Sequence, residues 1–417
     1  MKNQNRKIPK IRFNNSKIDW QQVKFKNLLN LKEGIRRGPF GSALKKEFFV
    51  QNSEYVVYEQ QNAIYDHFNT RYRISEEKYH ELNKFMLSSG DFIMSGAGTI
   101  GKISLVPDRI EKGVFNQALI RLRVNKNINK EFFLQWMRSP KMQNKLTKAN
   151  PASAMVNLVP MSEVKEWDVI VPSFHEQSAI GSLFRTLDDL LAGYKDNLAN
   201  YQSFKATMLS KMFPKAGQTV PEIRLEGFEG EWVEKCIGEL ADIVRGASPR
   251  PIQDPKWFDS NSEIGWLRIS DVTSQNGRIH SLGQKISKLG QEKTRVLTEP
   301  HLLLSIAATV GKPVINYVKT GVHDGFLIFM NPKFDREFMF QWLEMFREKW
   351  NQYGQPGSQV NLNSDIVKNQ KIFIPSIEEQ CVIGSYFSNL DNLISSNQEK
   401  ISQLETLKKK LLQDMFI

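Results

Sequence analysis

The sequence predicts a mixed α/β (α+β) protein that contains two similar globular domains and two long helices. Three observations indicate this fold class. Several short stretches occur twice in the same order, each half ends in a long amphipathic segment, and the rest of each half mixes strand-like runs with glycine turns. The repetition implies an internal duplication with pseudo-two-fold symmetry.

The clearest repeat is VPSFHEQSAIGSLF at Val171, which returns as IPSIEEQCVIGSYF at Ile374. Other stretches repeat in the same order in both halves, which excludes scattered coincidence. They are PKIRF at Pro9 and PEIRL at Pro221, each followed at a matched distance by a tryptophan (Trp20 and Trp232), SGAGTIGK at Ser95 and SIAATVGK at Ser305, FFLQWM at Phe132 and FMFQWL at Phe338, and VNL at Val156 and Val360.

These repeats divide the 417 residues into five segments. PKAGQTV is a short, turn-rich joint between the halves. The expected segments are a first globular domain at 1–170, a central long helix at 171–213, the linker at 214–220, a second globular domain at 221–373 and a C-terminal long helix at 374–417.

Within the globular domains, the local patterns predict both strands and helices. FIMS before Gly96 and KISLV after Gly101 are strand-like. EFFLQWMRSPKMQNKL at Glu131 and EFMFQWLEMFREKW at Glu337 carry aromatic residues at helical spacing. We assign these aromatic stripes to the core.

The two long segments have helix starts and heptad spacing. Ser173 with Glu176, and Ser376 with Glu379, match the S-x-x-E capping box. Apolar residues then alternate at spacings of four and three, which indicates a coiled coil and not a helix lying on a globular core. The predicted interface residues are Ile180, Phe184, Leu187, Leu191, Leu198, Ile383, Phe387, Leu390, Ile394, Ile401 and Leu404.

Polar residues interrupt the two stripes at Lys205 and Lys408, which are matched positions, and at Asn397. They either fix the register of the pair or snorkel at a frayed end. The helices could pair in parallel or antiparallel. An antiparallel pair of about 40 residues forms a rod of roughly 60 Å with a globular domain at each end, which suits a long two-fold ligand such as duplex DNA. We therefore predict an antiparallel coiled coil.

The charge balance bounds the class of partner. The formal net charge is +12, which favours nucleic acid or an anionic membrane surface, with simple solubility as the alternative. No apolar run is long enough to span a membrane, and the N-terminus lacks the apolar core of a signal peptide. Cys236 and Cys381 stand apart without a CxxC motif. We expect a cytoplasmic protein without a membrane partner, a disulfide framework or a cysteine-based zinc site.

The stretch GAGTIGK at Gly96 imitates a nucleotide-binding loop. Such loops hold phosphate at the start of a helix, but here the β-like run KISLVPD follows. Ile103 stands where a phosphate loop needs Ser or Thr, and the second copy, IAATVGK, has lost two glycines. We predict a tight turn between strands. No HExxH motif or Asn/Asp-Pro-Pro-aromatic motif occurs, so we expect no catalytic residue and no metal site.

The P-x-I-R-x…W motifs at Pro9 and Pro221, the [IV]-P-S-x-x-E-Q helix starts at Val171 and Ile374, and their ordered duplication carry a resemblance. Over essentially its full length, the chain resembles the specificity subunit of Type I restriction-modification systems. The first copy departs from the second before Trp20, where NNSKID replaces EGFEGE. The resemblance implies two target-recognition domains, each reading one half of a bipartite DNA site, with paired helices that set the gap.

The resemblance also implies the partners of a non-catalytic host-defence subunit. These are double-stranded DNA, two modification (methyltransferase) subunits and restriction (translocase/nuclease) subunits. S-adenosylmethionine, ATP and magnesium belong to the partner subunits, and this chain binds no cofactor. Because the duplication makes the chain nearly self-symmetric, the outer faces of the coil, together with the helix starts near Glu176, Gln177, Glu379 and Gln380, are expected to form two equivalent docking surfaces.

The segments between the shared motifs diverge, which implies two different half-sites. Reading them requires side chains at base edges and cations at phosphates. Arg-Gly turns occur at equivalent places, and ordinary solvated loops are the alternative interpretation. The predicted DNA-binding residues are Arg36, Arg37, Lys45, Arg245, Arg250 and Lys256.

Two other functions stay open at this point. A coiled-coil scaffold that binds only protein explains the long helices but not the basic charge. The other is a DNA-binding protein without a methyltransferase partner.

Overall fold

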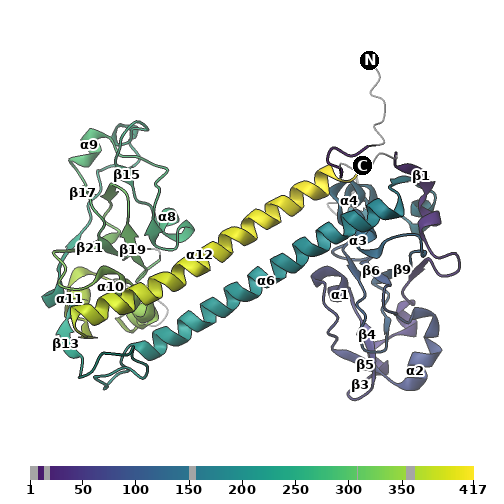
Figure 1. Cartoon of the computed structure of the whole chain (residues 1–417), viewed down its shortest axis with the longest axis horizontal. Helices are drawn as coiled ribbons and strands as arrows, with labels where there is room; N and C mark the ends of the chain where they lie inside the picture. The colour runs from purple at the N-terminus through teal and green to yellow at the C-terminus, as the bar shows by residue number, and fades with distance from the viewer. Residues whose placement is uncertain (1–7, 14–18, 150–155, 308, 354–361) are drawn as a thin grey trace. The chain divides into compact units, whose positions relative to one another are not determined.

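A computed structural model describes residues 8–13, 19–149, 156–307, 309–353 and 362–417. The chain forms two compact units. The first unit contains residues 1–195 and 399–417, and the second contains residues 196–398. Each unit therefore combines a globular part with stretches of both long helices (Figure 1).

The first unit is built on two four-stranded sheets. One sheet is antiparallel throughout, in the order β2 (Ile35–Arg37), β9 (Leu119–Leu122), β6 (Phe92–Ser95) and β7 (Ile103–Leu105). The other has the order β3 (Phe49–Val50), β5 (Tyr72–Ile74), β4 (Tyr55–Tyr58) and β8 (Gly113–Phe115), with β4 and β8 parallel. The two-stranded pairs are β1 (Gln21–Lys24) with β12 (Asp168–Val171), and β10 (Thr147–Ala149) with β11 (Val156–Leu158).

The second unit repeats this plan with one more strand in its larger sheet and one fewer in its smaller sheet. Its larger sheet has the order β14 (Asp242–Arg245), β21 (Phe326–Met330), β18 (Leu302–Ser305), β19 (Pro313–Asn316) and β16 (Arg278–Ile279). Its smaller sheet has the order β15 (Gly265–Trp266), β20 (Thr320–Val322) and β17 (Arg295–Leu297). A pair of strands, β13 (Val233–Cys236) and β22 (Lys371–Ile374), corresponds to β1 with β12.

Short helices cover the sheets in both units. The first unit has α1 (Gln60–Tyr65), α2 (Glu76–Glu81), α3 (Lys130–Arg138), α4 (Pro140–Leu146) and α5 (Met161–Lys165). The second has α7 (Ile237–Leu240), α8 (Ile269–Ser274), α9 (Lys288–Gln291), α10 (Arg336–Phe346) and α11 (Ser364–Asn369). The strands predicted around the glycine turn are confirmed as β6 and β7. The aromatic stripes are helical, as predicted, in α3 and α10. The first stretch is divided, however, because extended backbone at Ser139 separates α3 from α4, and the second continues beyond α10 as a 3-10 helix at Arg347–Tyr353.

The long helices are α6 (Phe174–Met212) and α12 (Ile377–Asp414), and they run antiparallel in each unit (Figure 1). In the first unit, Asp188 contacts Lys408 and Lys195 contacts Glu405. In the second unit, Lys205 contacts Asp391, and Phe213 stacks on Phe387. In both units the partner number falls as the α6 number rises, which confirms the predicted antiparallel pairing.

The beginning of each long helix packs into a globular core, which differs from the expected coiled coil standing clear of one. Ile180, Phe184 and Leu187 belong to the core of the first unit, together with Trp20 and Phe132. The matched residues of α12 join Trp232 and Phe338 in the second core; they are Ile383, Phe387 and Leu390. The apolar stripe at the start of each helix therefore packs against both the globular core and the end of the other long helix.

Further along the helices, the predicted interface residues are less enclosed. Leu191 and Ile394 are buried, whereas Leu198, Ile401 and Leu404 are half-buried. The end of each helix adds a phenylalanine that the sequence analysis did not single out. Phe416 stacks on Phe184 in the first unit, as Phe213 does on Phe387 in the second. The repeated Met-Phe pair at the two helix ends was the available signal.

Candidate nucleic-acid interface

A buried arginine–glutamate pair ties each long helix to the segment that opens its unit. Arg12 donates two hydrogen bonds to Glu176, at 2.7 and 2.8 Å. Arg224 donates two to Glu379, also at 2.8 and 2.7 Å. The glutamates are 3% and 1% exposed. The repeated P-x-I-R and E-Q motifs are thus partners in the fold.

The same pairing corrects the predicted capping boxes. Ser173 Oγ accepts the N–H of Glu176 at 3.4 Å, and Ser376 Oγ accepts that of Glu379 at 3.3 Å. Each box is only half formed, because the glutamate carboxylate is held by an arginine and does not return to the serine backbone. Long-range ion pairing has replaced the local hydrogen bond.

The side chains of the neighbouring glutamines also form hydrogen bonds inside the fold. Gln177 accepts the N–H of Asn129 at 3.0 Å, and Gln380 accepts that of Asp335 at 2.9 Å. Both glutamines are buried, as are Glu176 and Glu379. These four side chains therefore do not face a partner themselves, whereas docking at the helix starts around them and at the outer faces of the coil stays a prediction.

Lys205 and Lys408 do not fray: each makes an ion pair across the two helices. Lys205 pairs with Asp391, and Lys408 pairs with Asp188. A buried glutamine completes each cluster, with Gln341 donating to Asp391 at 2.8 Å and Gln135 donating to Asp188 at 3.1 Å. These are matched residues of the two copies. Charged groups inside an apolar stripe favour the one register in which they meet.

Asn397 does not contribute in this way. Its side chain is buried and donates to the carbonyl oxygen of Leu393, in its own helix, at 2.8 Å. The Asn397 side chain therefore forms its hydrogen bond within its own helix and does not fix the register of the helix pair.

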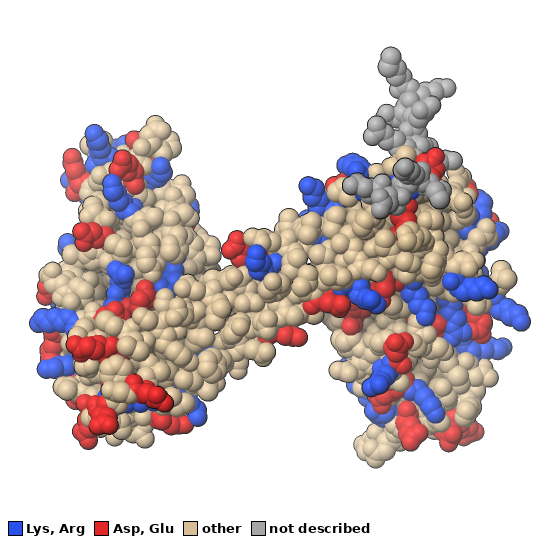
Figure 2. All heavy atoms as spheres, in the orientation of Figure 1, with Lys and Arg blue, Asp and Glu red and all other residues tan. Residues whose placement is uncertain are grey.

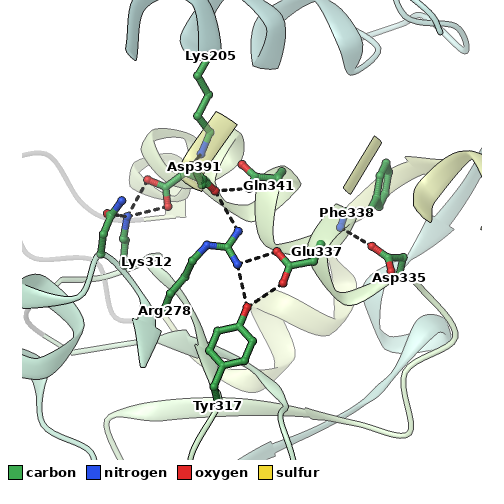
Figure 3. A network of polar contacts seen from close by, with 11 residues as sticks. Lys205, Arg278, Lys312, Tyr317, Asp335, Glu337, Phe338, Gln341 and Asp391 are labelled. Carbon is green, nitrogen blue, oxygen red and sulfur yellow. Dashed lines mark hydrogen bonds and ion pairs between the residues drawn. The ribbon is translucent and has the colours of Figure 1, made fainter. Parts of the chain in front are cut away.

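The second unit extends its cluster into the globular part (Figure 3). Arg278 contacts Asp391 at 3.0 Å and Glu337 at 2.8 Å, and Tyr317 donates to Glu337 at 2.9 Å. Burial disfavours the Arg278 cation, but the nearby Glu337 and Asp391 carboxylates raise the pKa above its usual value. This network joins the helix pair rigidly to β16 and α10.

In the first unit, the predicted DNA-binding residues separate into two places. Arg36 and Arg37 end strand β2 and line a hollow of about 870 Å³ beside the exposed Phe40. Arg37 is exposed, whereas Arg36 is half-buried with its Nε lacking a hydrogen-bond partner. Lys45 is exposed outside this hollow and lies 3.4 Å from Glu47.

In the second unit, two of the three predicted residues converge. Arg245 donates to the carbonyl oxygen of Asp324 at 2.7 Å, and Arg250 donates to its carboxylate at 2.7 Å. Lys256 does not join them, because it pairs with Asp254 at 2.8 Å and lies over the Trp257 ring at 4.5 Å. The structure brings Arg245 and Arg250 together around an acidic residue that the sequence analysis did not single out.

The glycine-rich stretch is a turn between two antiparallel strands, as predicted. Gly101 N–H donates to the carbonyl of Ser95 at 2.8 Å, and the second copy repeats this with Gly311 and Ser305 at 2.8 Å. Lys312, at the end of the second turn, pairs with Glu344. A strand follows each turn, so no helix N-terminus is available for phosphate.

The charged surface is mixed on the face seen in Figure 2, where Lys and Arg lie among Asp and Glu in both units. Within the described ranges, no group of three or more His, Cys, Asp or Glu side chains could hold a metal ion. No helix in the described part of the chain is long and apolar enough to cross a membrane.

Comparison with known proteins agrees with this duplicated architecture. A family model described as the Type I restriction modification DNA specificity domain matches twice, at residues 17–200 and 229–406. The putative type I restriction enzyme MjaX specificity subunit of Methanocaldococcus jannaschii is 21% identical over 356 residues, covering 81% of this chain and 80% of that protein. The MjaVIII specificity subunit of the same organism is 21% identical over 328 residues, covering 72% and 73%.

Solved structures share the fold. The crystal structure of a Type-I restriction-modification system S subunit from M. genitalium superposes with a TM-score of 0.64 at 16% identity, covering 98% of this chain and 99% of that one. A second solved structure, which concerns the complex assembly and conformational transition of the type I R-M system, superposes with a TM-score of 0.53 at 18% identity. The match covers 94% of this chain and 96% of that one.

Proposed function

Because this chain belongs to the Type I restriction-modification DNA specificity family, we propose that each unit reads one half of a bipartite site in duplex DNA. The chain is the specificity subunit and not the catalytic one. One observation carries the proposal. The two units repeat the same framework contacts, yet present different side chains beside their Arg-Gly turns. One framework with two sets of surface residues suits two different half-sites.

The boundaries follow from this function. We assign target recognition to the globular segments at 1–170 and 221–373, and the spacing of the half-sites to the helices at 171–213 and 374–417, with 214–220 as the linker. The predicted DNA-binding residues keep this role as proposals: Arg36, Arg37, Lys45, Arg245, Arg250 and Lys256. Arg37, Arg245 and Arg250 are exposed cations, which supports contacts with phosphate or guanine.

Matched apolar side chains on the long helices support two equivalent docking surfaces. In the first unit, the exposed residues are Phe174, Leu190 and Leu407; in the second they are Ile377, Leu393 and Phe204. Each residue of the first set is the duplicate of one in the second set. Exposed apolar residues at repeated positions indicate contact with protein. We therefore place one modification subunit on each set, so that two bind one copy of this chain.

The remaining partners follow from the same assignment. We place S-adenosylmethionine, ATP and magnesium in the modification and restriction subunits. The glycine turns support this placement, because a strand follows each of them and phosphate would find no helix start. The complex would act in the cytoplasm, where the DNA lies.

Co-expression with the methyltransferase subunits of its own system, followed by sequencing of methylated DNA, tests the proposal. A motif with two fixed half-sites and an unspecified gap supports it. Absence of such a motif, together with binding of no duplex in an electrophoretic shift assay, would favour a protein-binding scaffold instead. Equal binding of all duplexes would favour a DNA-binding protein without sequence preference.

A further inference from the structure

Two short loops, one in each unit, are built alike and differ at their central residue. We call them the central loops; they are Asn116–Ala118 before β9 and His323–Gly325 before β21. In the first, the Asn116 side chain accepts the N–H of Ala118 at 3.1 Å. In the second, His323 Nδ1 accepts the N–H of Gly325 at 2.9 Å. The middle residues are Gln117 and Asp324.

Each central loop lies against the Arg-Gly turn of its unit. A Cβ atom on Gly38 would lie 1.9 Å from the carbonyl oxygen of Asn116, and one on Gly246 would lie 2.1 Å from that of His323. Only glycine permits so close an approach. The Gly38 N–H donates to the carbonyl oxygen of Leu119, the first residue of β9, at 2.9 Å. The Gly246 N–H donates to that of Phe326, the first residue of β21, also at 2.9 Å. The middle residue of each loop therefore stands beside the arginine that precedes the glycine.

The side chain of Gln117 is open to solvent, and no described residue makes a hydrogen bond to its amide. It lines the same hollow as Arg36, Arg37 and Phe40, and Phe40 is 87% exposed. A free amide beside two guanidinium groups and an exposed aromatic ring is suited to a base edge and its phosphate.

The surroundings of Asp324 are basic. Ser248 Oγ donates to its carboxylate at 2.7 Å, as Arg250 does, while Arg245 holds its carbonyl oxygen. The Ser248 hydrogen bond lowers the pKa of Asp324, so the group is an ionised acceptor. The two arginines offset its charge, which removes the main obstacle to placing a carboxylate against DNA.

We propose that Gln117 and Asp324 determine specificity at one position of each half-site: Gln117 reads adenine and Asp324 reads cytosine. A glutamine amide matches the N6 donor and N7 acceptor of adenine, and a carboxylate accepts from the N4 amino group of cytosine. This inference rests on the proposed function, in which each unit reads one half-site. The framework places the two residues equivalently, and their different chemistry makes the half-sites differ.

Reciprocal variants test it in the co-expressed complex. Asp324→Asn should shift one position of one half-site from cytosine towards adenine, and Gln117→Glu should shift one position of the other half-site from adenine towards cytosine. Discrimination at that position should change by about 5- to 150-fold, the range for one mismatched base pair. Each variant should leave the other half-site unchanged, which also reports that the protein is folded.

Matched controls change the same charge elsewhere in the same unit. Asp365→Asn alters the exposed start of α11, and Asn127→Asp adds a charge in the turn between β9 and α3. Both should leave the motif intact. If a variant abolishes methylation, competition binding with duplexes changed at one base pair at a time decides the matter. Lost discrimination at one position supports the inference, and unchanged discrimination at every position overturns it.

An unchanged motif in both variants, or a change in both half-sites at once, would also overturn it. These results differ from failure of the proposed function, because in that case the unmodified chain yields no bipartite motif.

Discussion

Arg224 grips Glu379 with two hydrogen bonds, although 155 residues separate them in the chain. The carboxylate is 1% exposed, so a partner's loss leaves an uncompensated charge in the interior. We expect Arg224→Gln, which leaves the Glu379 carboxylate without its cation, to destabilise the second unit by about 3 kcal/mol. Urea unfolding measures the effect. Glu234→Gln, which breaks an exposed pair with Lys371 in the same unit, should change little.

The stability of the second unit should fall as the pH drops below about 6.5, the usual histidine value. Burial lowers the pKa of His323, although Asp324 opposes this. The unfolded chain therefore binds a proton at a pH where the folded chain does not, and acid favours unfolding. His323→Asn should remove this part of the pH dependence. Asparagine stands at the equivalent Asn116, where it makes the same loop hydrogen bond.

Thermal unfolding at a series of pH values measures this dependence. Parallel curves for His323→Asn and the unmodified chain between pH 5 and 7, which spans the usual histidine pKa, would show that His323 is not its source.

Two glycines with nearly the same backbone conformation should respond differently to alanine. Gly217 has φ +79° with nothing within 4 Å of an added Cβ, so Gly217→Ala should cost only the backbone strain, about 1–2 kcal/mol. Gly311 has φ +78°, but its Cβ would lie 2.5 Å from Cδ1 of the buried Trp350. Gly311→Ala should cost about 1–3 kcal/mol more. Equal losses of the free energy of unfolding, measured with urea, would mean that the Trp350 side chain moves aside without cost.

The docking surfaces predict a change in stoichiometry. Leu190→Glu and Leu393→Glu each place a charge on one of the two matched apolar sets. Native mass measurement should show one modification subunit on each single variant and none on the double variant. Leu289→Glu, at an exposed leucine of α9, is the control and should retain two. A single variant that lost both subunits would argue against independent surfaces.

Longer helices should lengthen the gap between half-sites. One heptad inserted after Leu198 and one after Ile401 preserve the apolar spacing and lengthen each helix by about 10 Å. That length corresponds to about three base pairs, which also turn the second half-site by roughly a quarter turn or more. Affinity should therefore fall even on the best new gap. Methylation mapping should find the same half-sites with a larger gap; an unchanged gap at full activity would contradict the role of the helices as spacers.

Sequence patterns alone predict the two-copy plan, the two long helices and many of the elements between them. These are local or repetitive patterns: a period of four and three residues in the helices, and turns marked by glycine between apolar strands. The turn at Gly101 and the aromatic helix α3 could be read in this way because neighbouring residues determine them.

Which polar residues meet follows from the folded arrangement and could not be predicted from local patterns. Glu176 satisfies the local rule for a capping box, yet its carboxylate belongs to Arg12, which lies 164 residues earlier. Lys205 interrupts an apolar stripe, and its partner Asp391 was hidden in the stripe of the other helix. A buried charge is satisfied wherever the fold brings an opposite charge, and separation along the chain carries no signal of that.

The candidate interface shows the same division. The Arg-Gly turns could be found because arginine and glycine stand together in both halves. Gln117 and Asp324 lie about 80 residues from those turns. Because one is a glutamine and the other an aspartate, the comparison of the two copies did not pair them. The fold places them equivalently, because the backbone at Gly38 passes close to the first central loop as the backbone at Gly246 does to the second.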